Sequence, residues 1–257
     1  MPTVNLERRG ALALVELARP ESGNALSAGL VADLHAALAA AAESGARALI
    51  LAGSGRNFCA GADLRELAAT ADAPLAAHLA DANRLAATYA ALLRCPLLTV
   101  AAVHGAAYGG GAGLAAACDL VVASPAARFQ FSEVRLGFVP ALVSAFLPRR
   151  VAPATLARLL LDPEPLAAAA AREAGLVDEI ADDARAAAGE RALAIVRKAA
   201  PSALAETKRL LLAALLPQLD RRLAAAAEAN ARQRTHPDCR RGVAAFLASR
   251  EFPDWTA

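Results

Sequence analysis

The chain has 257 residues, of which 57% are hydrophobic and 4% aromatic, and its formal net charge is +2. This length suffices for one large domain, or for one domain with an appendage. The near-neutral charge gives no indication of a nucleic-acid partner, and no uncharged apolar run has the length of a membrane-spanning helix, so neither nucleic acid nor a membrane is expected as a partner.

Cysteine usage and the first residues bear on redox state and compartment. The four cysteines have neither metal-ligand nor disulfide spacing, and they are Cys59, Cys95, Cys118 and Cys239. The opening segment MPTVNLERRG lacks the apolar core of a signal peptide. We therefore expect reduced, buried cysteines, no metal site and a cytoplasmic protein.

The first hundred residues alternate between strand and helix signals. In chain order, the pattern predicts a β-hairpin over residues 4–17, a helix from Ser27 to about Glu43, a buried strand over residues 48–51 and a long helix over about 74–93. Ser27 is a favourable N-cap because its hydroxyl can accept a hydrogen bond from the first helical turn.

The central stretch combines a buried strand with a glycine-rich turn. The apolar run Leu97–Val103 predicts the strand, and Gly109-Gly110-Gly111 then opens a short helix of small residues. Free N–H groups at such a helix start suit an anion, either a bound one or an oxyanion formed during reaction. The spacing fits neither the dinucleotide fingerprint nor the phosphate loop. Close packing of helix against strand is the alternative explanation of these glycines.

Beyond the glycines, short strands give way to helices. Strands are expected over residues 120–123, 128–131 and 177–181; a loop is expected over 132–139; and helices are expected over about 141–151, 154–161, 166–174, 202–215, 219–232 and 237–250. Gly175 is the expected C-cap of the helix that ends at residue 174. Two strands per helix argue for an α/β fold other than an ordinary doubly wound sheet.

A second loop of small residues has the same character as the glycine turn. Residues 58–64, FCAGADL, follow a strand and open a short helix, so they too leave backbone N–H groups free. Two converging N–H donors are what stabilises the enolate of a thioester during reaction. The two loops together predict an oxyanion-binding pocket.

Several segments, in this order and spacing, resemble the crotonase or enoyl-CoA hydratase/isomerase superfamily over nearly the whole chain. They are ARPESGNALS, ALILAGSGRNFCAGADL, VHGAAYGGGAGLAAACDLVVAS, ARFQFSEVRLGFVP, AREAGLVDEI and GVAAFLASR. The resemblance implies a spiral of strand-strand-helix units as the core, over residues 1–200. It also implies a helical region over residues 201–257 that assembles trimers or hexamers. The implied ligand is an acyl-coenzyme A, with no further cofactor.

The resemblance also implies a set of site residues. The oxyanion donors are the backbone N–H groups of Ala62 and Gly110, and the catalytic carboxylate is Glu133. Coenzyme A or acyl contacts are implied or proposed for Arg19, Ala25, Leu26, Ala60, Asp63, Leu64, Tyr108, Gly109 and Gly113. Arg19 has a solvated surface role as its alternative, Asp63 fits a helix cap or turn better than an acid, and core packing is the alternative for Tyr108.

The chain departs from the two-glutamate hydratases at one position. Those enzymes carry a glutamate three residues after the oxyanion glycine, where this sequence has Gly113, whereas Glu133 is present. An acyl-lined pocket would raise the pKa of Glu133 towards the range useful for proton transfer. Gly113 together with FSEVRLGFVPA most resembles bacterial hydratases of methylglutaconyl-CoA.

Three hypotheses follow. The leading one is a hydro-lyase that adds or removes water across C2–C3 of an enoyl-CoA, including a branched or glutaconyl-type substrate. The second is a Δ3-Δ2-enoyl-CoA isomerase that uses Glu133 alone. The third is a non-catalytic acyl-CoA-binding protein, against which the retained Glu133 argues.

Overall fold

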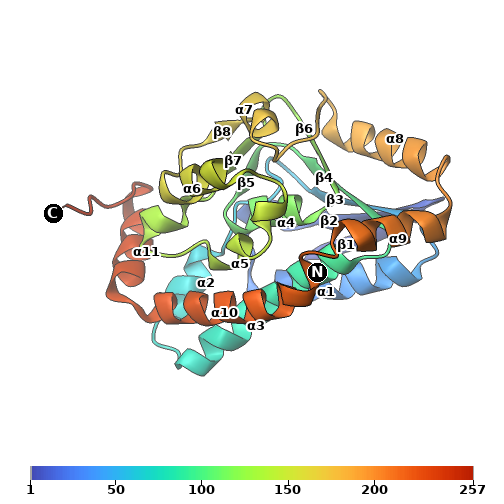
Figure 1. The fold of residues 1–257 in the computed structure, drawn as a ribbon. Coiled ribbons are helices and arrows are strands. Elements are labelled where there is room, and N and C mark those ends of the chain that lie inside the picture. The colour runs from blue at the N-terminus through green and yellow to red at the C-terminus, as the bar shows by residue number, and fades with distance from the viewer. Residues whose placement is uncertain (1, 257) are drawn as a thin grey trace.

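A six-stranded sheet forms the frame of the molecule in the computed structural model, which describes residues 2–256 (Figure 1). The first two strands form the predicted antiparallel hairpin, and every later strand pairs in parallel with its neighbour. In spatial order the strands are β1 (Val4–Arg9), β2 (Leu12–Leu17), β3 (Ala48–Gly53), β4 (Leu98–Val103), β6 (Leu120–Ala123) and β9 (Glu179–Ile180).

A smaller sheet lies beside it, adds one strand that was not predicted and corrects one expectation. Its strands, in spatial order, are β5 (Ala106–Tyr108), β7 (Arg128–Gln130) and β8 (Leu166–Ala167). The sequence pattern did not indicate β5, and it wrongly placed Leu166 and Ala167 in a helix. Both residues instead pair antiparallel with β7, so a partner distant in sequence decides their conformation.

The helices largely follow the predicted order. They are α1 (Ala28–Glu43), α2 (Leu64–Ala69), α3 (Leu75–Arg94), α4 (Gly110–Ala117), α5 (Ala141–Ser144), α6 (Pro153–Leu161), α7 (Ala168–Glu173), α8 (Ala184–Val196), α9 (Pro201–Leu211), α10 (Leu216–Thr235) and α11 (Pro237–Ser249). Short 3-10 helices are η1 (Pro20–Ser22), η2 (Ser132–Leu136) and η3 (Leu147–Arg149). As predicted, Ser27 caps α1, accepting from the N–H of Leu30 at 3.2 Å.

Two further expectations need correction, and one helix had no prediction. The helix expected over residues 141–151 is broken into α5 and η3, because Pro148 lacks an N–H and its ring clashes with the carbonyl one turn earlier. The expected loop over residues 132–139 contains η2. The unpredicted helix is α8.

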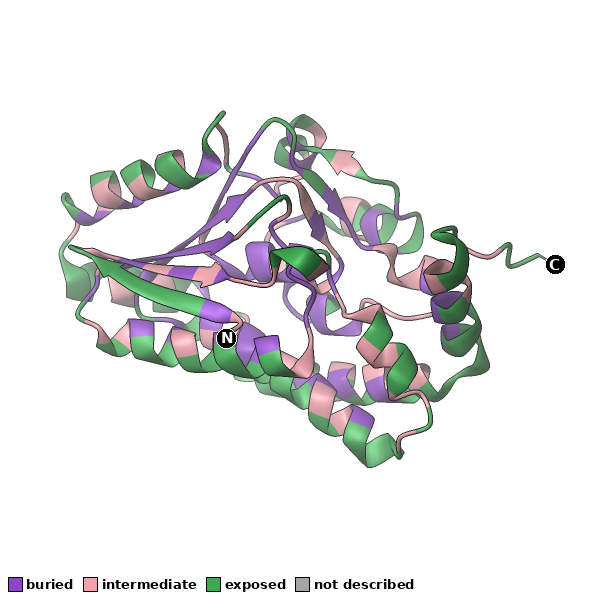
Figure 2. Ribbon diagram, turned by 180° about the vertical axis from the view of Figure 1, so that it is seen from behind, coloured by how far each residue is buried: buried purple, intermediate pink, exposed green. Residues whose placement is uncertain are grey.

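Helices cover both faces of the main sheet. One face packs against α8 through side chains at every fourth position, namely Ala184, Ala188, Ala192 and Val196. The other face packs against α1 and α4, and α3 packs on these two helices, so that all three contribute to the larger core. Because side chains alternate along a strand, Ile50 of β3 faces the first layer while Leu49 and Leu51 face the second. Figure 2 shows buried strands between helices with exposed outer surfaces.

The C-terminal helices pack on the rest of the chain. Helix α10 lies along α3, and α11 packs against α2 and η2 (Figure 1). The division into segments 1–200 and 201–257 stays a prediction; residues 1 and 257 lie outside the described part. Of the helices described, none has both the length and the apolar character required to cross a membrane.

Candidate active site

Backbone hydrogen bonds join the two loops of small residues. The N–H of Cys59 donates to the carbonyl of Ala106, and the N–H of Tyr108 donates to the carbonyl of Cys59, both at 3.0 Å. The close approach requires glycine, since a Cβ on Gly111 would lie 2.4 Å from the Cys59 carbonyl oxygen. The predicted convergence of the two loops is therefore confirmed. The glycines also allow the close packing that was the alternative explanation for them, so the two explanations do not exclude each other.

The two expected oxyanion donors lie in the same pocket. The parallel bridge of Leu26 with Ala62 uses the N–H groups of Leu26 and Asp63, which leaves that of Ala62 unused by the bridge. Gly110 is the first residue of α4, and its N–H precedes the first α4 hydrogen bond, from Gly113 to Gly109. Both residues line a pocket that also contains Glu133. The positive end of α4 thus faces this pocket together with free N–H groups.

Glu133 lies against the start of α4. A Cβ on Gly109 would be 3.1 Å from Glu133 Oε1, so the carboxyl group packs on the backbone directly before Gly110. Oε2 of Glu133 is buried and has no hydrogen-bond partner. Burial raises the pKa of Glu133 to about 7. The direction of this shift is the one predicted from the sequence. A carboxyl group in this state can both accept and release a proton near neutral pH.

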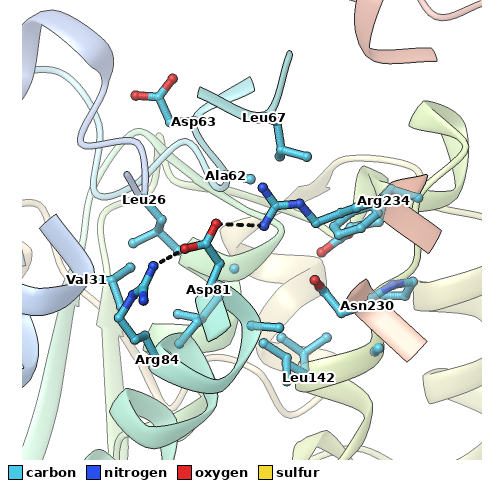
Figure 3. A pocket seen from close by; sticks show the side chains of 18 of the residues that line it. Leu26, Val31, Ala62, Asp63, Leu67, Asp81, Arg84, Leu142, Asn230 and Arg234 are labelled. Carbon is cyan, nitrogen blue, oxygen red and sulfur yellow. Dashed lines mark hydrogen bonds and ion pairs between the residues drawn. The ribbon is translucent and has the colours of Figure 1, made fainter. Parts of the chain in front are cut away.

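The pocket is apolar on one side and charged on another. The segment from Phe138 to Val143 forms the apolar wall, and Leu26, Val31 and Leu85 add to it. On the other side the Asp81 carboxylate lies between the guanidinium groups of Arg84 and Arg234 (Figure 3). The arrangement suits a short apolar chain with a polar group at some point along it.

The predicted binding residues divide between this pocket and its surroundings. Leu26 and Asp63 line it, whereas the others do not, namely Arg19, Ala25, Ala60, Leu64, Tyr108, Gly109 and Gly113. Asp63 caps α2, as predicted, by accepting from the N–H groups of Arg65 and Glu66. Arg19 pairs with Asp63 at 3.3 Å and is only 22% exposed, so it is not a fully solvated surface residue. Coenzyme A contacts at these positions stay predictions.

Tyr89 occupies the space that we expected Gly113 and Tyr108 to border. It lies on α3, is fully buried, and its hydroxyl donates to the carbonyl of Gly110 at 2.9 Å. A Cβ on Gly113 would lie 2.8 Å from this hydroxyl and 2.5 Å from Val143. Gly113 is therefore covered rather than open to the pocket. The tyrosine that lines the pocket is Tyr89, since α3 crosses the start of α4, whereas Tyr108 lies in β5.

Sequence reasoning missed the pocket residues that come from helices. Tyr89, Asp81 and Arg84 lie on α3, and Arg234 lies on α10. Asp81 and Arg84 have the spacing of an ion pair on one helical face, which is a local signal that could have been noted. No local signal places α10 beside α3, so Arg234 could not have been assigned to the pocket.

The remaining reactive groups fit structural roles. All four cysteines are buried and unpaired, and burial raises the pKa of Cys59 to about 12, which leaves the thiol protonated. Nε2 of His104 lies 2.9 Å from the carbonyl oxygen of Gly55. Across residues 2–256, no group of three or more histidine, cysteine and acidic side chains is placed to hold a metal ion.

Comparisons with known proteins give related sequences and structures over nearly the whole chain. The profile of the enoyl-CoA hydratase/isomerase family matches residues 7–257. A candidate enoyl-CoA hydratase from Thermus thermophilus is 40% identical over 244 residues, which cover 94% of this chain and 96% of that protein. An enoyl-CoA hydratase structure from Mycobacterium avium has a TM-score of 0.86 at 32% identity, with 98% of each chain covered. An enoyl-CoA hydratase/isomerase structure from Mycobacterium paratuberculosis has a TM-score of 0.89 at 27% identity, covering 95% of this chain and 98% of that one.

Proposed function

The chain belongs to the enoyl-CoA hydratase/isomerase family of the crotonase superfamily, and we propose that it is an enoyl-CoA hydratase in which Glu133 is the single catalytic carboxylate. It is an enzyme of this family, whose members act on acyl-CoA thioesters. The observation that carries the proposal is the buried carboxyl group of Glu133, which packs beside the oxyanion-donor turn and has a pKa of about 7. Bound coenzyme A enters as part of the substrate, and we propose no further cofactor.

The proposed reaction uses the two loops and Glu133 in turn. The N–H groups of Ala62 and Gly110 donate to the thioester oxygen and stabilise the negative charge that develops there. The Glu133 carboxylate accepts a proton from water as the water oxygen bonds to C3, and the C2–C3 π electrons move onto the thioester as an enolate. Protonated Glu133 then gives its proton to C2, which restores the thioester carbonyl and completes the addition of water.

Replacement of Glu133 by glutamine tests this mechanism. The amide preserves the size of the side chain but can neither accept nor deliver the proton, so Glu133→Gln should lower kcat by on the order of 10²-fold or more. Binding of the coenzyme A ester should be largely retained. Loss of the enoyl thioester absorbance on addition of crotonyl-CoA measures the rate. Glu173→Gln, at an exposed position of α7, is the matched control.

A kcat in Glu133→Gln equal to that of the unaltered protein would contradict the assignment. Unchanged turnover in Glu173→Gln, alongside the loss at Glu133, would show that the effect belongs to the buried carboxyl group.

Double-bond isomerisation is the second candidate, and Gly113 favours it. Moving a proton from C2 of a 3-enoyl-CoA to C4 needs one carboxylate, and the packing of Tyr89 and Val143 against Gly113 leaves no space there for a second. Conversion of a 3-enoyl-CoA into its conjugated isomer, without hydration of crotonyl-CoA, would identify this activity.

For the hydratase we propose a branched or glutaconyl-type acyl group. This proposal is supported by the resemblance of Gly113 and FSEVRLGFVPA to methylglutaconyl-CoA hydratases. A panel of straight, branched and carboxylated enoyl-CoAs, compared by kcat/KM, tests it. Preference for unbranched, uncarboxylated chains would contradict it.

A further inference from the structure

Two arginines share one carboxylate in the wall of the pocket. Asp81 accepts from Arg84 through one oxygen and from Arg234 through the other, the latter at 3.2 Å. The three side chains carry two positive charges and one negative charge. The cluster therefore has a guanidinium charge that no carboxylate within it neutralises (Figure 3).

Arg234 is the member of this cluster that is shielded from water. Its side chain is only 10% exposed, whereas that of Arg84 is 47% exposed. Of the five N–H donors of the Arg234 guanidinium, one bonds to Asp81 and one to the hydroxyl of Thr70, and Nε has no partner. A buried cation with unused donors costs free energy unless an anion or further acceptors complete it.

The other titratable groups around Arg234 do not supply this anion. His78 is buried beneath the cluster, and burial together with the charge of Arg234 lowers its pKa, so it is neutral at pH 7. Asp63 pairs with Arg19, and the carboxylate of Glu66 accepts from the N–H of Ala28 at the start of α1. Neither of these carboxylates forms a hydrogen bond or an ion pair with Arg234, whose contacts are with Asp81 and Thr70.

We propose that Arg234 is a specificity-determining residue that binds a carboxylate at the far end of the acyl group. The inference rests on the proposed function and deepens it. The pocket offers an apolar wall at residues 138–143 for a short carbon chain and one incompletely neutralised guanidinium for its end. Asn230, one helical turn before Arg234 on α10, lines the same pocket and can donate to the same carboxylate (Figure 3).

Two substrates that differ in one group isolate this contact. Glutaconyl-CoA and trans-2-pentenoyl-CoA have the same chain length and double bond, and differ only in a terminal carboxylate or methyl group. We expect the unaltered protein to prefer glutaconyl-CoA. In Arg234→Gln, the ratio of the two kcat/KM values should fall by on the order of 10²-fold, as for loss of one partner of a buried charge pair. Arg234→Lys, which keeps the charge, should retain part of the preference.

Arg232→Gln is the matched control. It removes an arginine from the same helix, but Arg232 is 63% exposed and forms its ion pair with the exposed Glu228, outside the pocket, so the substrate ratio should not change. Taking the ratio within each variant cancels losses of stability, because these affect both substrates equally. A melting curve of each variant identifies any failure to fold.

Distinct results would overturn the inference and the proposed function separately. Equal losses on both substrates would mean that Arg234 contacts coenzyme A phosphates or only ties α10 to α3, and the inference would fail. If the unaltered protein hydrates neither substrate, the proposed function fails. Calorimetric affinities for the two thioesters, in the unaltered protein and in Arg234→Gln, would still decide whether Arg234 recognises the carboxylate.

Discussion

Burial sets the chemistry available to Glu133. An exposed glutamate is almost fully ionised at pH 7 and is a weak base, whereas desolvation brings the pKa of Glu133 to about 7. A hydrogen bond from the backbone of Glu133 itself lowers the pKa, but the effect of burial is larger, and Oε2 has no hydrogen-bond partner. One residue can then serve first as base and later as acid, which is what a site with a single carboxylate requires.

The pH dependence of kcat/KM should reveal this pKa. In the proposed mechanism the reaction starts from the Glu133 carboxylate. Lowering the pH protonates this group, so kcat/KM for crotonyl-CoA should fall about tenfold per pH unit below about pH 7. Initial rates from pH 5 to 9 measure the profile. An acidic limb near 4.5, the ordinary value for glutamate, would mean that Glu133 is hydrated in solution or is not the base.

Individual site residues could be predicted from the sequence only where they belong to a recognisable motif. Glu133, Ala62 and Gly110 belong to segments with a recognisable order, and they share one pocket as expected. The surroundings of Gly113 could not be predicted in this way. The Tyr89 hydroxyl covers Gly113 because α3 packs on α4, and nothing in the local sequence specifies that contact.

At the level of elements, the Glu133 segment is held by the C-terminal helices. Gln233 of α10 donates to the carbonyl of Gly137 at 2.8 Å, directly after η2. Helix α11 packs so closely on η2 that a Cβ on Gly242 would lie 2.2 Å from the carbonyl oxygen of Leu136. The helices expected to serve assembly thus also support the segment that carries Glu133.

A methyl group at Gly242 should disturb this support. Gly242→Ala forces α11 and η2 apart, and the displacement reaches Glu133 three residues before Leu136. We expect kcat for crotonyl-CoA to fall at least tenfold even at temperatures where the variant is fully folded. Activity at a temperature well below the melting point of the variant measures this.

Gly189→Ala is the control for that experiment. Gly189 lies inside α8, where a Cβ would meet only the Leu12 side chain at 3.7 Å. Alanine there should leave activity unchanged and stabilise the protein by up to about 1 kcal/mol through helix propensity. Equal activity of the two variants would show that α11 does not position Glu133.

Among the helices and strands, those with local sequence signals could be predicted, and those that depend on distant partners could not. The hairpin, the Ser27 cap and the glycine turn are local, and their signals lie within a few residues. Strands β5 and β8 are too short to carry a pattern and exist through their pairing with β7. Helix α8 is rich in alanine, so its buried stripe contrasts little with its exposed face.

For the whole molecule, the informative element is α9, whose packing within the chain is incomplete. None of its residues is buried, and Leu210 and Leu211 are 58% and 81% exposed. Lys208 nevertheless fixes the helix in place, pairing with Asp119 at 2.7 Å and donating to the carbonyl of Leu97 at 3.1 Å. A helix held firmly with its leucines outward fits a surface that another subunit covers.

We therefore predict a trimer-based assembly organised by the helices after Pro201. Light scattering at micromolar protein should give a mass of three or six chains. Leu211→Glu should lower this mass, since a carboxylate would be buried without a partner on each contacting subunit. Leu161→Glu changes a leucine that is 76% exposed outside these helices, and should leave the mass unchanged. A stable monomer of the unaltered protein would refute the prediction, and a loss of mass only in Leu161→Glu would move the interface to α6.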